Sequence, residues 1–310
     1  MLIYVSRRLL WTPVLLFFAG LFIFSLSSIT PGDPAELMAG QRADPEAIER
    51  IRDRLGLNDP FMVQYLRYIS DAFKGDLGES YRYRGRDVVE LLAPRLKVSL
   101  ELNIVSYFVT LIIGLPLGFW AAMRQGTWKD PTATTFMLLV YALPVFFTAP
   151  FLILVFALWL DWIPVSGWSG IFSTQAILPA VTLGVPGAFV FMRYMRASTL
   201  DVLGQEFVRT AHGKGMGHMT VNRRHIARNA LIPIMTILGF SLAGMFGGSL
   251  IVELIYGIPG VARLSLEAVF QRDYPLLMAL TILGTTMLAL ANLFTDIMYS
   301  VIDPRIRLRA

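Results

Sequence analysis

The stretch that decides the fold class is Arg193–Asn229, which reads RYMRASTLDVLGQEFVRTAHGKGMGHMTVNRRHIARN. It is polar and basic, and long apolar runs lie on both sides of it. It contains all three histidines of the chain and the basic residues Arg193, Arg196, Arg209, Lys214, Arg223, Arg224 and Arg228, against only Asp201 and Glu206 as acids. Such a segment predicts a loop on one face of a membrane, serving either as a docking element for a protein or as an anchor on lipid headgroups.

The apolar runs around this loop have the length that a membrane requires. The chain has 310 residues, of which 55% are hydrophobic and 16% are charged. Apolar segments of about 20 residues read as spanning helices, because backbone amides in lipid must bond within their own segment. We therefore expect an all-α, polytopic membrane protein with about six spans. They are Leu9–Ile29, Leu102–Met123, Thr132–Leu160, Ala176–Met192, Asn229–Val252 and Tyr274–Thr295.

The distribution of Lys and Arg predicts the orientation of the spans. The N-terminus with Arg7 and Arg8, the basic loop and the C-terminal arginines fall on one side, which we expect to be the cytoplasm, whereas the short opposite loops carry Arg263 and Arg272. The predicted parts are a cytoplasmic N-terminus with the first span (1–29), an extracytoplasmic helical loop (30–97), a five-helix core (98–302) that carries the basic loop at about 193–230, and a cytoplasmic tail (303–310).

The loop 30–97 is predicted to be folded. Asp44-Pro45 and Asp59-Pro60 have the form of helix starts, and the glycines Gly56 and Gly75 can end those helices. Aromatic residues line one face of the second helix, and we expect them to pack against one another or, alternatively, to contact a soluble partner. A third amphipathic piece, Asp87–Ala93, precedes Pro94 and is expected to lie on the membrane surface.

The basic loop divides into two predicted helices. Ser198-Thr199-Leu200-Asp201 resembles a capping box and predicts a helix start, and Gly213, Gly215 and Gly217 predict a helix end and a turn. A second helical stretch, Met219–Leu231, then leads into the next span. A short helix tied to two spans can transmit a movement, because its ends must move with those spans.

Small and acidic residues in the spans are the remaining candidates. Gly114-x-x-x-Gly118 and Gly244-x-x-x-Gly248 predict close helix contacts. Glu101, Glu253 and Asp296 lie near span ends, where a carboxylate either reaches the interface or serves a function, and the sequence leaves their role open.

The sequence predicts no catalytic centre. Gly213-Lys214 lacks the other residues of a phosphate-binding loop, and the absence of cysteine excludes thiolate metal ligands and disulfides. We therefore expect a chain that is not an enzyme and binds no cofactor or metal.

Several motifs resemble one transporter family. Arg209-Thr210-Ala211-His212-Gly213-Lys214-Gly215 and the later Arg228-Asn229-Ala230-Leu231-Ile232-Pro233 resemble the EAA loop of ABC importer permeases, in the form found in dipeptide, oligopeptide and nickel permeases. Arg209-Thr210 stands where the general EAA consensus has Glu-Ala. Three further stretches are similar to that subfamily: Pro31-Gly32-Asp33-Pro34, Leu55-Gly56-Leu57-Asn58-Asp59-Pro60 with Gln64-Tyr65, and Gly75-Asp76-Leu77-Gly78-Glu79-Ser80.

The resemblance implies a fold of the type I importer permease kind and a place in a larger assembly. Such a permease pairs with a second permease and two ATPase subunits, which use ATP and Mg, and receives a peptide from an extracytoplasmic binding protein in a bacterial or archaeal plasma membrane. The implied ATPase-coupling residues are Glu206, Arg209, Thr210, Ala211, Lys214, Gly215 and Met216.

Other functions stay open from the sequence. The same importer class carries nickel complexes, glutathione or oligosaccharides, and a stand-alone secondary transporter or a membrane scaffold are more distant alternatives. The implied partners include membrane lipid but no nucleic acid, since the basic residues lie beside predicted spans.

Overall fold

The computed structural model describes residues 2–29, 33–39, 44–83, 85–242, 245 and 247–302. Within these residues all regular elements are helices, which confirms the all-α prediction; the one β interaction given is an isolated bridge between Glu79 and Asp87. The chain divides into two compact units, one built mainly from residues 1–97 and 260–293, the other mainly from residues 98–259. The predicted C-terminal tail, 303–310, lies outside the described residues, as does the side chain of Asp296.

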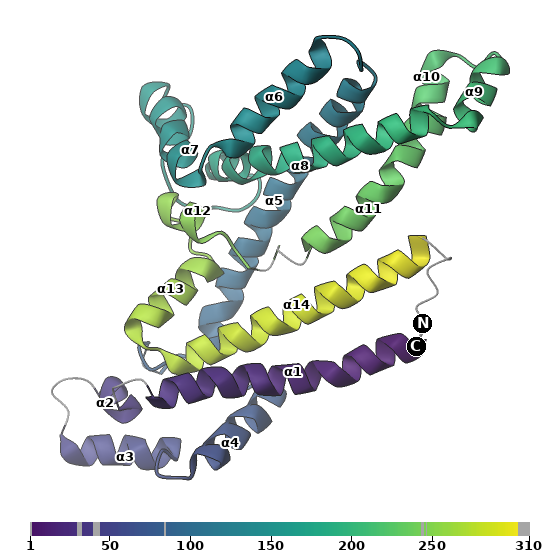
Figure 1. Cartoon of the computed structure of the whole chain (residues 1–310). Coiled ribbons are helices and arrows are strands. Elements are labelled where there is room, and N and C mark those ends of the chain that lie inside the picture. Colours follow the sequence, from purple (N-terminus) through teal and green to yellow (C-terminus); the bar gives the residue numbers. More distant parts are fainter. Residues whose placement is uncertain are drawn as a thin grey trace. The chain divides into compact units, whose positions relative to one another are not determined.

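The first unit contains the chain's first four helices and two of its last (Figure 1). These are α1 (Leu2–Ile29), α2 (Pro34–Ala39), α3 (Pro45–Leu55), α4 (Phe61–Phe73), α13 (Val261–Gln271) and the first part of α14 (Tyr274–Ile302). The long helix α5 (Val88–Ala122) begins in this unit and continues into the second. The second unit adds α6 (Lys129–Ala142), α7 (Val145–Leu152), the π-helix η1 (Ile153–Trp159), the short 3₁₀ turn η2 (Thr174–Ala176), α8 (Ile177–Leu203), α9 (Glu206–Gly213), α10 (His218–Thr220), the π-helix η3 (Val221–Ala227), α11 (Arg228–Leu242) and α12 (Leu250–Ile255).

Four helices of the described chain are long and apolar enough to cross a membrane. They are Leu10–Ile29, Val88–Ala122, Thr174–Leu203 and Tyr274–Leu293. The pair Lys129–Ala142 and Val145–Trp159 is a fifth candidate, but it bends by 96° between its halves. Leu143 has an extended backbone because the ring of the following Pro144 disfavours a helical conformation in the residue before it. The predicted span Thr132–Leu160 is therefore a bent pair of helices rather than one straight helix, and the proline at position 144 is the interruption.

The predicted span Asn229–Val252 is also not one helix. α11 ends at Leu242 and α12 begins at Leu250, and Gly248 adopts φ +66° with an extended Ser249 after it. A left-handed glycine cannot continue a right-handed helix, so Gly248 does not act in a helix contact motif. Its predicted partner Gly244 lies outside the described residues.

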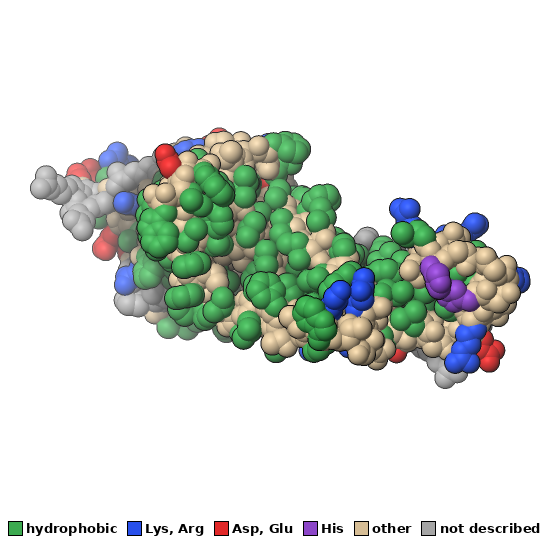
Figure 2. Space-filling view, turned by 90° about the horizontal axis from the view of Figure 1, so that it is seen from above, with side chains coloured by type: hydrophobic (Ala, Val, Ile, Leu, Met, Phe, Trp, Pro, Cys, Tyr) green, Lys and Arg blue, Asp and Glu red, His purple; other side chains and the backbone are tan. Residues whose placement is uncertain are grey.

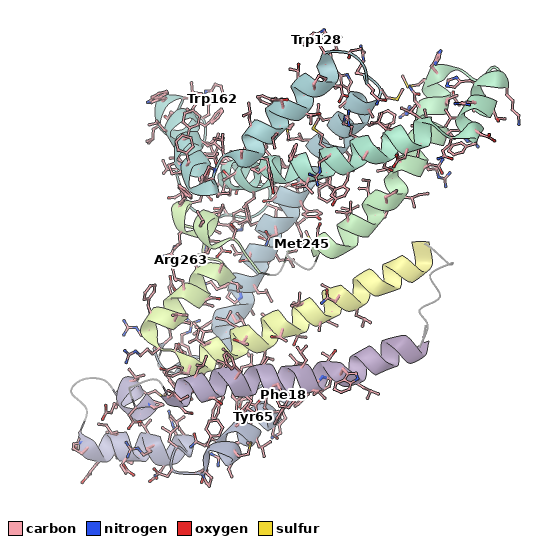
Figure 3. The ribbon with its side chains drawn as sticks, viewed as in Figure 1. Phe18, Tyr65, Trp128, Trp162, Met245 and Arg263 are labelled. Carbon is pink, nitrogen blue, oxygen red and sulfur yellow. The ribbon has the colours of Figure 1, made fainter. Side chains whose placement is uncertain are left out.

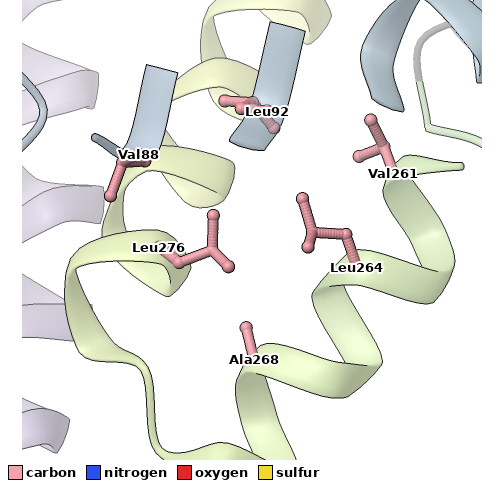
Figure 4. Packing of buried hydrophobic residues seen from close by; sticks show 7 residues of the cluster. Val88, Leu92, Val261, Leu264, Ala268 and Leu276 are labelled. Carbon is pink, nitrogen blue, oxygen red and sulfur yellow. The ribbon is translucent and has the colours of Figure 1, made fainter. Parts of the chain in front are cut away.

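The start of α5 differs from the prediction as well. The expected surface piece Asp87–Ala93 forms the first turns of α5, which runs through Pro94 without a break. Val88 and Leu92, one turn apart, are buried with Val261, Leu264 and Leu276 of the same unit (Figure 4). This burial stabilises the first turns of α5, which precede the apolar run predicted to begin at Leu102, since tertiary packing contributes more to most helices than local propensity.

The loop before α5 is folded, as predicted. α3 begins at Pro45, and Gly56 follows its end with φ +62°. Ser80 and the backbone N–H of Tyr81 both donate hydrogen bonds to the carboxylate of Asp273, which is 1% exposed at the start of α14. A buried carboxylate requires such partners, so this contact ties the loop to a residue far away in the sequence.

The second unit is organised by a close contact between α5 and α8. A Cβ atom on Gly114 would lie 2.6 Å from the carbonyl oxygen of Ala188, and one on Gly118 would lie 2.4 Å from that of Met192. The contact predicted from Gly114-x-x-x-Gly118 is confirmed. Each glycine allows the two backbones to approach more closely than any side chain would permit.

We predict that Gly118→Leu separates α5 from α8. The inserted side chain meets backbone atoms that cannot move aside, so the substitution should cost about 1–3 kcal/mol or more. The matched control is Gly284→Leu, also within a helix, where nothing lies within 4 Å of the added Cβ atom. Thermal unfolding of the detergent-purified chains measures the difference. Equal melting temperatures for the two variants would contradict the contact.

Candidate functional site

The candidate site is the part of the basic loop that lies between α8 and α11, residues 204–227. Its first helix, α9, begins at Glu206 after an extended Gln205. The predicted helix start at Ser198 is wrong, because α8 continues to Leu203. Ser198 instead donates a hydrogen bond of 2.8 Å to the carbonyl oxygen of Ala230 in α11. This bond joins the two helices that lead into and out of the loop.

The end of α9 matches the predicted glycine turn. Gly215 has φ +76°, a left-handed conformation that favours glycine. The backbone N–H groups of Gly215 and Met216 donate to the carbonyl oxygens of His212 and Ala211, at 2.9 and 3.3 Å. Unpaired carbonyls at the helix end are thereby satisfied, as in other left-handed helix caps.

The basic loop has a small hydrophobic core of its own. Val208 and Ala211 of α9 are buried together with Val221 and Ile226 of η3. Four partly buried residues pack around them: Phe119, Val202, Leu203 and Met216. Two of the residues implied by the family resemblance, Ala211 and Met216, therefore contact the chain itself and hold α9 against η3.

The opposite face of α9 is exposed. It presents Glu206, Arg209 and Thr210, with Lys214 just beyond its end. Phe207 lies on the flank of this face and is 42% exposed. Phe207 was not among the residues predicted from the sequence. A bulky aromatic residue in an otherwise polar helix could have indicated a contact site. The surface thus combines both signs of charge with one large apolar side chain, a composition suited to a protein partner.

Histidines lie beside this exposed face. The rings of His212 and His218 have centroids 5.2 Å apart. Figure 2 shows the histidine side chains beside Lys and Arg at the end of the second unit that α9 and α10 form. Among the described residues no group of three or more His, Cys, Asp or Glu could hold a metal ion.

Two buried polar contacts fix the helices behind the basic loop. Arg196 of α8 donates to both carboxylate oxygens of Asp130 at the start of α6, each at 2.6 Å, and Asp130 is 5% exposed. A bidentate pair of this kind sets the orientation of both side chains. Together with the bond from Ser198 to Ala230, it connects α8 to both α6 and α11 next to the loop.

Acidic residues elsewhere in this unit are also held in place. Glu253, whose role the sequence left open, is fully buried in α12 and accepts a hydrogen bond of 2.7 Å from Ser99. Glu101 accepts a bond of 3.2 Å from the indole of Trp168. Both carboxylates therefore join α5 to later segments of the chain.

The sequence is similar to known proteins over nearly its whole length. Residues 114–308 match the family described as binding-protein-dependent transport system inner membrane component, and residues 1–102 match the N-terminal model of the same kind of component. The chain is 37% identical over 311 residues to the probable peptide ABC transporter permease protein y4tP of Sinorhizobium fredii, covering 98% of this chain and 99% of the relative. It is 38% identical over 310 residues to the glutathione transport system permease protein GsiC of Shigella flexneri, covering 99% of each.

One solved structure shows a related fold. The MetNI methionine ABC transporter matches with a TM-score of 0.51 at 16% identity, covering 68% of this chain and 97% of that chain. At this identity the likeness concerns the fold alone.

The inward position of Ala211 generates a prediction. Ala211→Asp places a carboxylate in the core of the basic loop, where an unpaired charge is costly, so α9 should detach from η3. The control is Thr210→Asp, which adds the same charge at an exposed neighbour. Limited trypsin digestion of the purified chain should cleave the Ala211 variant near Lys214 at least ten times faster. Equal cleavage rates in both variants would rule out the buried position.

Proposed function

The chain belongs to the family of inner membrane components of binding-protein-dependent transport systems, and we propose that it is the permease subunit through which such a system imports peptides. The observation that carries the proposal is the basic loop, whose folded core presents an exposed, charged face while its base is fixed to α8, α11 and α6. The relatives named for peptide and glutathione transport support a peptide as the substrate, glutathione being itself a peptide.

We propose that α9 docks on an ATPase subunit. Phe207 is the apolar anchor of this contact, and Arg209 and Lys214 add charged contacts around it. Large apolar side chains at the centre of a contact carry most of its free energy, whereas charged side chains at the rim contribute less. Closure of two ATPase subunits around ATP and Mg then moves the basic loop, and the loop moves α8 and α11 with it.

The rest of the assembly follows from the same family. We propose a second permease and two ATPase subunits in the complex, with an extracytoplasmic binding protein that delivers the peptide. The N-terminus, the basic loop and the C-terminus lie in the cytoplasm, and the part of the segment 30–97 that ends at Asn58 lies outside. The charge distribution supports this orientation. It also supports six crossings in total, with the α6–α7 pair and the α11–α12 region as broken rather than straight spans.

Reporter fusions test the orientation. A reporter inserted near Gly217 and one after Arg309 should both report the cytoplasm, whereas one near Asn58, in the turn between α3 and α4, should report the outside. Alkaline phosphatase and green fluorescent protein fusions give opposite signals on the two sides. Asn58 and Gly217 on the same side would exclude the proposed arrangement.

The docking proposal predicts a strong effect at Phe207. Phe207→Asp replaces the apolar anchor by a charge and should lower the amount of ATPase that co-purifies by about 30-fold, the effect of losing roughly 2 kcal/mol. The control is Phe207→Tyr, which keeps the ring and should change the yield less than threefold. Undiminished ATPase binding by the Asp variant would remove Phe207 from the contact.

Reconstitution tests the transport function itself. In liposomes the chain with a second permease and two ATPases should hydrolyse ATP faster when a peptide-loaded binding protein is added, because the loaded protein prefers one conformation of the complex. Dipeptides, oligopeptides, glutathione, a nickel chelate and an oligosaccharide are compared as cargo. Uptake of the nickel chelate or the oligosaccharide alone would contradict the peptide assignment. Uptake by the isolated chain under an ion gradient would contradict the importer assignment.

A further inference from the structure

Helix α4 of the segment 30–97 packs on α1, which carries a candidate membrane span. Tyr65 of α4 is fully buried, and its hydroxyl donates to the carbonyl oxygen of Phe17 in α1. Its ring also lies 5.2 Å from that of Phe17 and 5.4 Å from that of Phe24. Figure 3 shows Tyr65 next to the part of α1 that carries Phe18. The predicted packing of the α4 aromatics against one another is therefore replaced by packing on α1.

The contacted part of α1 belongs to its candidate membrane span. This span runs from Leu10 to Ile29, and Phe17, Gly20 and Phe24 lie within it. The Tyr65 ring fits over Gly20, where a Cβ atom would lie 2.9 Å from the tyrosine oxygen. α4 therefore lies alongside residues of a candidate membrane span. If α1 is surrounded by lipid at this depth, α4 is surrounded by lipid too.

α4 is amphipathic, and its apolar arc is wider than its contact with α1. At about 3.6 residues per turn, Met62, Leu66 and Phe73 fall on the flank beside the buried Tyr65. They are 47%, 51% and 77% exposed. Asp71 lies on the opposite, polar flank of the helix, and its side chain is 41% exposed. Large exposed apolar side chains gathered on one flank mark a surface that something apolar covers.

An apolar groove continues this flank. It has a volume of about 500 Å³ and is lined by Pro13, Val14, Leu16, Phe17, Ile69, Ala72, Phe73, Ile282 and Thr286. The lining residues come from α1, α4 and the candidate span of α14. Thr286 is the one residue among them that carries a hydroxyl group. An open groove without charged groups between spanning helices suits an acyl chain, which needs apolar contact and no hydrogen bonds.

We propose that α4 is a membrane-embedded helix, and that its apolar flank and this groove bind the acyl chains of membrane phospholipids. The exposed side of α1 supports lipid as the occupant. Trp11, Leu15, Phe18 and Phe22 are exposed within the same span, so the lipid-facing surface of α1 continues onto α4. The proposal rests on the spanning helices α1 and α14 and does not depend on the substrate of the transporter.

The experiment uses single-cysteine variants of the full chain, which has no cysteine of its own. An environment-sensitive NBD dye is attached at Leu66→Cys, Phe73→Cys and Asp71→Cys, and each protein is placed in phosphatidylcholine nanodiscs. Doxyl groups on the acyl chains quench dyes in lipid, whereas iodide quenches dyes in water. Phe18→Cys on α1 serves as the reference for a lipid-facing position, since this residue is 62% exposed within the span.

The expected result is that dyes at Leu66 and Phe73 are quenched by doxyl lipid within twofold of the reference and shielded from iodide. The dye at Asp71, on the opposite flank of the same helix, should show at least threefold less doxyl quenching and remain open to iodide. Iodide quenching at Leu66 and Phe73 would place α4 in water and overturn the proposal. Shielding of both positions from iodide and from doxyl lipid would show that a protein surface covers them, and would overturn it equally.

Discussion

The close approach of α5 and α8 is the contact on which the second unit depends. Apolar side chains gain little from leaving lipid for a protein interior, so helices in a membrane associate through tight packing and hydrogen bonds. Gly114 and Gly118 on α5, and Gly184 on α8, bring the two backbones within reach of each other. Thr110 adds a hydrogen bond of 2.8 Å to the carbonyl oxygen of Gly184. α8 is therefore fixed along much of its length before it reaches the basic loop.

The basic loop builds on this fixed helix. Its hydrophobic core includes Phe119, near the end of α5, and Val202, near the end of α8. The same pair of helices thus supports both the membrane part of the unit and the base of α9. A partner that binds the exposed face of α9 contacts a folded element. A movement of this element is transmitted to α8, because packed side chains connect the two.

Local chemistry made part of this structure predictable. The glycines at 56, 114, 118 and 215 occupy the turns and contacts expected of them, because glycine alone combines positive φ or close backbone approach with little strain. Family-like motifs in the segment 30–97 also have structural reasons. Gln64, for example, donates to the carbonyl oxygens of Leu57 and Asp59 and closes the turn before α4.

Long-range packing was not predictable from the pattern of residues. Pro144 indicates an interruption of its helix, but hydropathy does not register the 96° bend, because both halves of the α6–α7 pair are apolar. The periodicity of α4 indicated an apolar face but not that α1, nearly 50 residues earlier, covers part of it. Ala211 resembled a docking residue in the motif, yet its neighbours in η3 place it inside. In each case the deciding partner lies outside the local window that a motif covers.

The central claim is that the basic loop moves together with α8. Spin labels at Thr210→Cys on α9 and Asp201→Cys on α8, both exposed positions, measure it directly in the assembled transporter by pulsed electron paramagnetic resonance. The account predicts one narrow distance distribution that stays the same with and without ATP, while the ATPase subunits close. A distribution that broadens or shifts on ATP binding would show that α9 moves relative to α8, and would contradict the rigid connection.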